Sequence, residues 1–288
     1  MRYSFIIPYY NRPNELWNTM LSYRHWYSRR DDIEILVIED LANNQNEKYH
    51  DELIDVLYAY GDLHWIHLLS EYKNQRNPVR HRNYAAKLAK GKVLMLTNPE
   101  CYHRNNILEG IDKVFTVGSS KKRIGYLPEK FGPDHPQWNV PSFQQKYKSL
   151  QHSENFDPYV VCACENCRLS QKRFDDFELM NKDPIREAWY QHSAHNNRRL
   201  HWCSFISADN YKQIGGFDEA YSNFVGYDDD DFRETVLKNG INIITRDDLV
   251  VAHIKHSVQH HDGTMPLSEK GLAYFNSKWP HAKMIMYR

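Results

Sequence analysis

The residues best suited to chemistry in this sequence are four consecutive aspartates at positions 228–231, which directly follow Gly226 and Tyr227. Neighbouring carboxylates repel one another, so at least one of them gains affinity for a proton or a metal ion. Aspartates are also favoured in the first turn of a helix, where the helix dipole stabilises negative charge. The two readings are compatible, because one carboxylate of a helix N-terminus can face a cleft.

Closely spaced cysteines suggest a second kind of site, a structural Zn²⁺ ion. Cys162, Cys164 and Cys167 lie close together, and Cys203 follows downstream. Three thiolates and one further ligand are the usual shell of a structural zinc site. Buried free thiols would give the same pattern. The chain has five cysteines, an odd number that fits a reducing compartment better than a disulfide framework.

Two further pairs of side chains could bind a nucleotide. Arg80 and Arg82 carry guanidinium groups, which match the geometry of phosphate, although arginines on a helix are commonly solvated. Glu39 and Asp40 follow an apolar run, and carboxylates at a strand end can accept hydrogen bonds from a base or a ribose. A plain buried strand followed by a solvated turn is the alternative.

Alternating strands and helices must position these groups. Apolar runs predict strands, and helical spacing between them predicts helices. The predicted strands are 3–7, 33–38, 63–68 and 92–96, and the predicted helices are 12–27, 47–60 and 78–89. This repeat predicts an α/β fold with a doubly wound, mostly parallel sheet, whose ligands bind beyond the carboxyl ends of the strands. The site is therefore expected at residues 8–12, 39–40 and 97–103.

The second half of the chain is less regular. Residues 128–155 are rich in proline and polar residues and are read as a long loop, with regular structure returning near Tyr159. Strands are predicted at 204–207, 241–244 and 249–254, a helix starts near Asp209, and another spans 230–238. We expect one domain over 1–288, with two halves at 1–127 and 128–288.

Three segments resemble the family-2-type and galactosyltransferase-like glycosyltransferases of the GT-A fold. They are residues 5–12 with the acidic pair at 39–40, residues 80–94 beginning Arg-His-Arg-Asn, and residues 215–219 (Gly-Gly-Phe-Asp-Glu) followed by the aspartate run. The resemblance covers most of 3–100 and 200–256, and residues 101–190 do not align. It implies a GT-A fold with a Rossmann-like central sheet and transfer of a sugar from a nucleotide donor. It also implies that the half at 1–127 binds the nucleotide sugar and that the half at 128–288 is the acceptor-side, catalytic half.

The resemblance also assigns roles to residues. It implies that Asp229, or else Asp228, is the base that takes the proton from the acceptor hydroxyl as the sugar is transferred with inversion. It places Trp189, His192, Gly216 and Tyr227 at the acceptor or the donor sugar, although an aromatic cluster such as that at 189–192 is equally typical of a core. The donor-binding residues that it implies are Pro8, Tyr10, Asn11, Arg12, Glu39, Asp40, Arg80, Arg82 and Asn98.

The metal motif departs from the family pattern. Members of the family carry Asp-x-Asp after the fourth strand, where this chain reads Thr-Asn-Pro-Glu at 97–100. Asn98 and Glu100 still offer oxygen ligands for Mn²⁺ or Mg²⁺. In several branches of the family a histidine completes the site, and His253 and His256 are the candidates here. The alternative is a metal-independent enzyme that holds the phosphates with cationic side chains.

We expect the donor to be a UDP-sugar. Two other functions compete with sugar transfer. The missing Asp-x-Asp motif is compatible with a catalytically inactive relative that only binds nucleotide sugars. A nucleotidyltransferase would need a glycine-rich phosphate loop after the first strand, where this chain has Pro-Tyr-Tyr-Asn at 8–11. The absence of glycine there argues against a nucleotidyltransferase.

Composition limits the partners. Lysine plus arginine equals aspartate plus glutamate at 37 each, which disfavours nucleic acid but leaves modified nucleic acid a minor option because of local basic clusters. An acceptor glycan, a lipid-linked sugar or a protein remain open. No apolar run approaches the roughly 18 residues of a membrane span, and the N-terminus lacks a signal-peptide pattern. The expected location is the cytoplasm.

Overall fold

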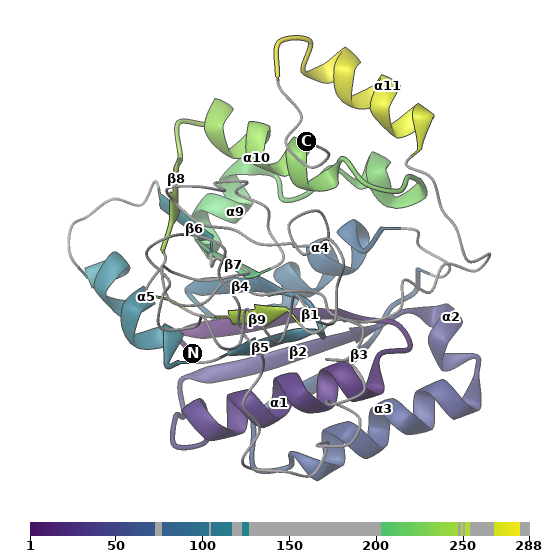
Figure 1. Ribbon diagram of the computed structural model, residues 1–288, viewed down its shortest axis with the longest axis vertical. Helices are drawn as coiled ribbons and strands as arrows, with labels where there is room; N and C mark the ends of the chain where they lie inside the picture. Colours follow the sequence, from purple (N-terminus) through teal and green to yellow (C-terminus); the bar gives the residue numbers. More distant parts are fainter. Residues whose placement is uncertain are drawn as a thin grey trace, which may run out of the picture.

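The computed structural model describes residues 1–72, 77–103, 105–116, 123–126, 203–246, 249, 251–253 and 268–282. These residues form an α/β fold around one seven-stranded sheet (Figure 1). Its strands are β1 (Tyr3–Tyr9), β2 (Ile33–Glu39), β3 (Trp65–Leu69), β4 (Val93–Thr97), β6 (Arg123–Tyr126), β7 (Cys203–Ser207) and β8 (Asn242–Thr245). A separate two-stranded ladder consists of β5 (Cys101–His103) and β9 (Val251–His253).

Helices cover both faces of the sheet. Two of them begin at residues with a clear local reason: α1 has proline in its first turn, and Ser207 caps α9 by accepting a hydrogen bond from the Asn210 amide at 3.2 Å. The helices are α1 (Pro13–Tyr27), α2 (Leu41–Asn44), α3 (Glu47–Ala59), α4 (Val79–Leu88), α5 (Ile107–Thr116), α9 (Ala208–Ile214), α10 (Asp228–Lys238) and α11 (Glu269–Lys278), with a 3-10 helix η2 (Glu219–Asn223).

The strand order is β3-β2-β1-β4-β7-β6-β8. Strand β7 runs antiparallel to both of its neighbours, and every other pairing in this sheet is parallel. The predicted mostly parallel sheet is therefore confirmed. The chain moves outward from β1 to β2 and β3 and then returns to the other side of β1 as β4. This reversal creates a switch point between the carboxyl ends of β1 and β4, where ligands of such sheets bind.

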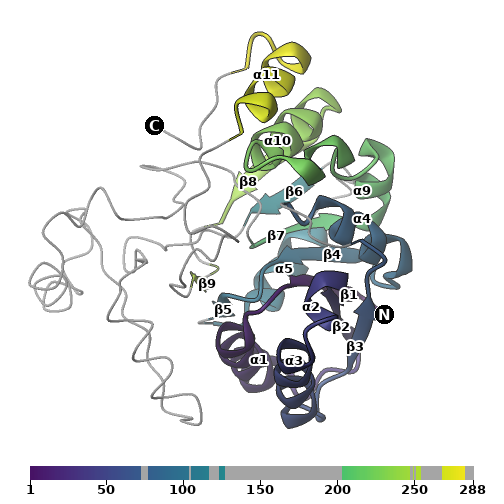
Figure 2. The same ribbon diagram turned by 90° about the vertical axis from the view of Figure 1, so that its right-hand side faces the viewer.

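Two hydrophobic cores lie on opposite faces of the sheet. Phe5 and Ile7 of β1 belong to the core covered by α1 and α3, whereas Ile6 belongs to the core beneath α4, α9 and α10. Figure 2 shows these two groups of helices on either side of the strands. Because successive side chains of a strand point to opposite faces, a strand buried on both sides needs the continuous apolar run that the sequence has.

Several elements differ from the prediction. Strand β1 continues through Pro8 to Tyr9, although Pro8 was expected to end it. Beyond Ile6 this strand pairs only with β2, so a residue without an amide proton is tolerated there. Helix α10 begins at Asp228, two residues earlier than predicted, because all four aspartates occupy its first turn. Elements β5, α5, β6 and α11 were not predicted.

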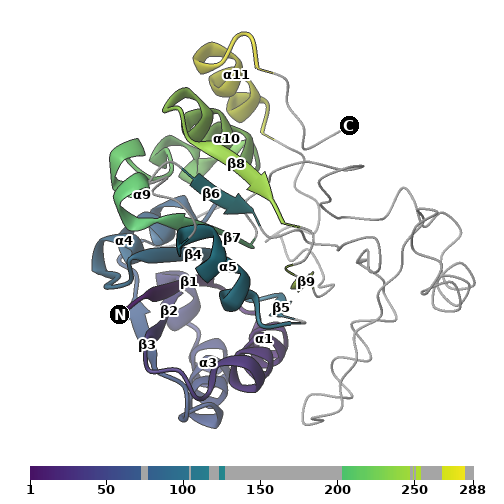
Figure 3. The same ribbon diagram turned by 90° about the vertical axis from the view of Figure 1, so that its left-hand side faces the viewer.

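The strand predicted at 249–254 does not extend the main sheet. It is shorter, spanning Val251–His253, and it pairs antiparallel with β5. Helix α11 lies on the outer side of α10, in both Figure 2 and Figure 3. The loop predicted at 128–155 lies outside the described residues. Within the described parts of the chain, no helix has the length and apolar character of a membrane span.

Candidate functional site

The turn after β1 is strained. Asn11 has a φ of +44°, in the left-handed region that asparagine tolerates better than most residues. Tyr10, Asn11 and Arg12 are partly exposed and stand at the switch point, next to the strand end that carries Asp40. Backbone strain of this kind is often found at ligand sites. The turn therefore presents the predicted donor-binding residues at the expected edge of the sheet.

Arg82 is the charged centre of this edge. It lies on α4, is buried, and donates a hydrogen bond from Nη2 to Oδ1 of Asn98 at 2.6 Å. Burial lowers the pKa of Arg82, while the carboxylates of Asp228, Asp229 and Glu100 act in the opposite direction. A buried cation within reach of three carboxylates implies that α4, the segment after β4 and the start of α10 meet at one place. The structure thus brings together four of the predicted site residues around Arg82.

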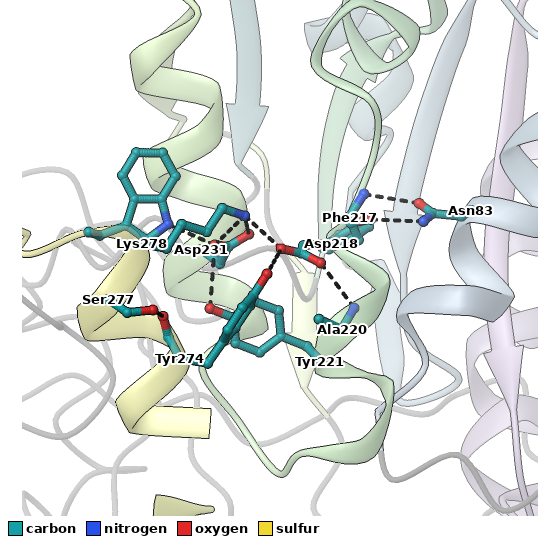
Figure 4. A network of polar contacts seen from close by, with 10 residues as sticks. Asn83, Phe217, Asp218, Ala220, Tyr221, Asp231, Tyr274, Ser277 and Lys278 are labelled. Atoms are coloured by element: carbon teal, nitrogen blue, oxygen red, sulfur yellow. Dashed lines mark hydrogen bonds and ion pairs between the residues drawn. The ribbon is translucent and has the colours of Figure 1, made fainter. Parts of the chain in front are cut away.

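Asn83 joins the second and third motifs. Its Nδ2 donates to the Phe217 carbonyl at 2.8 Å, and its Oδ1 accepts from the Phe217 amide at 2.9 Å and from the Tyr211 hydroxyl at 2.7 Å. Figure 4 shows the paired bonds between Asn83 and Phe217. The side chain also contacts Glu219. The predicted acceptor-side glycine, Gly216, lies directly against the Asn83 side chain. The contacts of Asn83 therefore fix the position of the Gly-Gly-Phe-Asp-Glu turn relative to α4.

Substitution of Gly216 tests this contact. Gly216 has a φ of +74°, and a Cβ there would lie 2.5 Å from Asn83 Oδ1 and 3.0 Å from the Tyr211 ring. We expect Gly216→Ala to lower the free energy of unfolding by about 3 kcal/mol, from backbone strain plus the displaced Asn83. Gly215→Ala is the matched control, because its φ is +83° but no atom lies within 4 Å of the added Cβ. Urea unfolding should show a loss of only about 1–2 kcal/mol for the control; equal losses would contradict the role of Asn83.

The four aspartates have different surroundings. Asp230 is fully buried and pairs with Arg233 at 2.8 Å. Asp231 accepts from Lys278 Nζ at 2.8 Å and from Trp279 Nε1 at 2.7 Å, in the network around Tyr274 and Asp218 drawn in Figure 4. Burial raises the pKa of Asp231, and the bonds from Lys278 and Trp279 oppose that change. Asp230 and Asp231 thus hold α10 together and attach it to α11, whereas Asp228 and Asp229 act on Arg82.

The residue before this run is also strained. Tyr227 precedes α10 with a φ of +69°, directly after Gly226 at +79°. Its ring is 4% exposed and packs in the core beneath α10, next to Gly271 and Phe275 of α11. A bulky residue held in the left-handed region by its packing sets the direction of the first turn of α10. Because its ring is buried, Tyr227 influences the site through the backbone conformation that it sets at the start of α10.

The predicted metal residues are brought close through the backbone. Glu100 is buried and immediately precedes β5, and Cys101 of β5 pairs with His253 of β9. Residues 153 positions apart in the sequence thus become near neighbours at the carboxyl end of β4. Asn98 already accepts the Arg82 bond. The remaining candidate, His256, lies outside the described residues.

The zinc prediction is only partly covered by the structure. Cys203 lies buried on β7, with its Sγ 3.8 Å from His103 Nε2. The Cys101 thiol contacts the Cys203 side chain and has a pKa raised by burial. Cys162, Cys164 and Cys167 lie outside the described residues, as do the predicted acceptor residues Trp189 and His192. The zinc shell and the acceptor cluster stay predictions.

The acidic pair at the end of β2, Glu39 and Asp40, faces two directions. Asp40 Oδ1 accepts from the Ala42 amide at 2.7 Å, and its Oδ2 lies 3.5 Å from His81 Nε2 on α4. Burial lowers the pKa of His81, which Asp40 opposes. Glu39 instead contacts His50 and His67, two histidines that the sequence analysis missed. Only the strand order shows that these two histidines, one on a helix and one on a strand, lie beside Glu39.

Comparison with known proteins agrees with this geometry. The profile of the family described as glycosyl transferase family 2 matches residues 4–163, more than half of the 288 residues. The chain belongs to glycosyl transferase family 2. The match spans β1, β2 and β4 and so includes the predicted donor edge of this family 2 chain. Among curated proteins, no sequence matches it significantly.

Solved structures give the same fold for this family 2 chain. TarS 1-349 of S. aureus in complex with UDP-GlcNAc superposes with a TM-score of 0.56 at 15% identity, covering 98% of the chain and 68% of TarS 1-349. Another TarS 1-349 structure gives 0.51 at 15% identity, covering 88% of this chain but 60% of TarS. The mannosyltransferase PcManGT from Pyrobaculum calidifontis, in complex with GDP-Man and Mn²⁺, gives 0.54 at 12% identity, covering 91% and 59%. At these identities the likeness concerns the fold, and the chain spans about two thirds or less of each relative.

Proposed function

We propose that this chain transfers a sugar from a nucleoside-diphosphate donor to an acceptor hydroxyl, with inversion. The observation that carries the proposal is the convergence on Arg82 of Asn98 and Glu100 from the end of β4 and of Asp228 and Asp229 from the start of α10. This convergence lies beside the switch point of a family 2 fold. It supports a site in which the proposed base, a cation and a strand-end binding edge act together.

The donor nucleotide binds along the ends of β1 and β2. Tyr10, Asn11 and Arg12 form one wall, and Asp40 supplies a carboxylate that can accept from the base or the ribose. Arg80, partly exposed above Tyr72 and 3.7 Å from Glu219, is available to the diphosphate. The complexes of TarS with UDP-GlcNAc and of the mannosyltransferase with GDP-Man support a nucleotide-sugar donor. A UDP-sugar is our preferred donor.

A divalent metal ion near β5 is part of the proposal. Glu100 and His253 would hold it, and an imidazole among the ligands favours Mn²⁺ over Mg²⁺. When bound, the ion would supply positive charge to the leaving diphosphate. The Mn²⁺ complex of the mannosyltransferase supports this assignment. Arg82 interacts electrostatically with Glu100, and its positive charge would assist the same leaving group.

Asp229 is the proposed base, with Asp228 as the alternative. Both begin α10 and both act on Arg82, which holds the carboxylates at the edge of the site. The base takes the proton from the acceptor hydroxyl as its oxygen attacks the anomeric carbon, and the diphosphate leaves on the opposite side. Asp230 and Asp231 are less suitable, because Arg233, Lys278 and Trp279 bind their oxygens.

The decisive experiment is a panel of nucleotide sugars with and without Mn²⁺, followed by thermal shift and by donor hydrolysis. Mn²⁺-dependent stabilisation together with hydrolysis of one UDP-sugar is the expected result. Stabilisation without hydrolysis or transfer would favour a nucleotide-sugar-binding relative, which the missing Asp-x-Asp motif makes the second candidate. No response to any nucleotide sugar would overturn the proposal.

A further inference from the structure

Three side chains from three elements converge at the carboxyl ends of β2 and β3. Glu39, the last residue of β2, is fully buried. Its Oε2 lies 2.9 Å from Nδ1 of His50 on α3 and 2.8 Å from Nε2 of His67 on β3. The three ligand atoms all lie within 4.8 Å of one another. Elsewhere in the described part of the chain, no other three His, Cys, Asp or Glu side chains come this close.

The chemistry of this group suits a transition-metal ion. Two imidazole nitrogens and one carboxylate oxygen are a ligand set that zinc uses, whereas Mg²⁺ and Ca²⁺ prefer oxygen ligands. Around a tetrahedral Zn²⁺, with bonds of about 2.0–2.1 Å, neighbouring ligand atoms lie roughly 3.3 Å apart. The two contacts with Glu39, at 2.8 and 2.9 Å, need to lengthen by about half an ångström. The two histidine nitrogens, which lie within 4.8 Å of each other, need to reach the same separation.

The surroundings allow an ion to enter and to be held. The His50 side chain is 34% exposed and that of His67 is 16% exposed, while the Glu39 side chain is inaccessible. The two histidines thus lie between solvent and a buried carboxylate. A low local dielectric strengthens the attraction of that carboxylate for a cation. A water molecule or a solute can complete the shell from the exposed side, as in zinc sites with three protein ligands.

We propose that Glu39, His50 and His67 bind one Zn²⁺ ion, at a site distinct from the Glu100 and His253 position near the donor diphosphate. The ion links α3 to β2 and β3 just beside Asp40, on the edge proposed to bind the nucleotide. Glu39 then acts as a metal ligand, and Asp40 is left as the carboxylate that meets the donor. The site does not depend on sugar transfer. A hydrogen-bonded Glu39 without metal is the competing outcome.

The test is zinc binding to the full-length chain after removal of metals with a chelator. Isothermal titration with Zn²⁺ should give one equivalent that is lost in both His50→Ala and His67→Ala. Each loss should weaken binding by more than the roughly 10- to 100-fold that removal of an outer-shell partner costs. His25→Ala is the control, because His25 is exposed on α1, packs edge-on against Trp26 and is not a member of the group. It should bind zinc like the unmodified chain.

A second measurement does not depend on how the variants fold. Co²⁺ bound by two nitrogens and an oxygen lacks the near-ultraviolet charge-transfer band that cysteine thiolates produce, which separates this site from the cysteines at 162–167. Crystals soaked in Zn²⁺ should show anomalous density between Glu39, His50 and His67. No anomalous peak at that position, or an equivalent of zinc that both histidine variants retain, would overturn the proposal. Failure of the nucleotide-sugar panel would leave it intact.

Discussion

Asp229→Asn is expected to lower the rate of sugar transfer by roughly 10²- to 10⁴-fold, the contribution typical of a positioned general base. The substitution keeps the size of the side chain and removes its ability to accept a proton. The measurement is the turnover number with the donor that the nucleotide-sugar panel identifies. Nucleotide affinity should change little, because the proposed base contacts the acceptor and not the nucleotide.

Two matched variants sharpen this test. Asp209→Asn makes the same change in the first turn of α9, where the residue is exposed, and should leave turnover unaltered. Asp228→Asn should reduce turnover less than Asp229→Asn if Asp229 is the base. A large loss in Asp228→Asn with near-normal turnover in Asp229→Asn would transfer the role to Asp228. Normal turnover in both would remove the aspartate run from the chemistry.

Arg82→Met should be the most damaging single change to this edge of the sheet. The variant keeps a long apolar stem but leaves the carboxylates of Asp228, Asp229 and Glu100 without the Arg82 charge. Removing one partner of a buried ionic group costs about 3–5 kcal/mol of unfolding free energy. The bond to Asn98 and the contact with the Phe217 ring are lost as well. Urea unfolding at neutral pH measures the loss of stability. UDP titration at neutral pH measures the effect on nucleotide binding.

Arg80→Met is the control for Arg82→Met. Arg80 is partly exposed and its nearest carboxylate, that of Glu219, lies 3.7 Å away, so its loss should cost less than about 1 kcal/mol. The destabilisation of Arg82→Met should shrink as the pH falls, because protonated carboxylates no longer repel one another. Equal stability of the two variants, or a pH-independent loss in Arg82→Met, would show that Arg82 does not balance these carboxylates.

The sequence by itself determined the local structure of the first hundred residues and the family. The apolar runs at 3–7, 33–38 and 92–96 are strands on physical grounds that operate within a few residues. The same holds for the helix at the aspartate run, because aspartate near a helix N-terminus is stabilised by the helix itself. The family resemblance came from those segments, and the profile match over residues 4–163 confirmed it.

Only the tertiary structure decided which residues meet. Asn83 contacts Phe217 across 134 positions, Cys101 pairs with His253, and Glu39 meets His50 and His67. It also separated Asp230 and Asp231, bound to Arg233 and α11, from the two aspartates beside Arg82. Such contacts depend on strand order, register and side-chain direction, which long-range packing sets. Local periodicity does not predict these contacts, because the pattern of a segment is the same whichever segment it packs against.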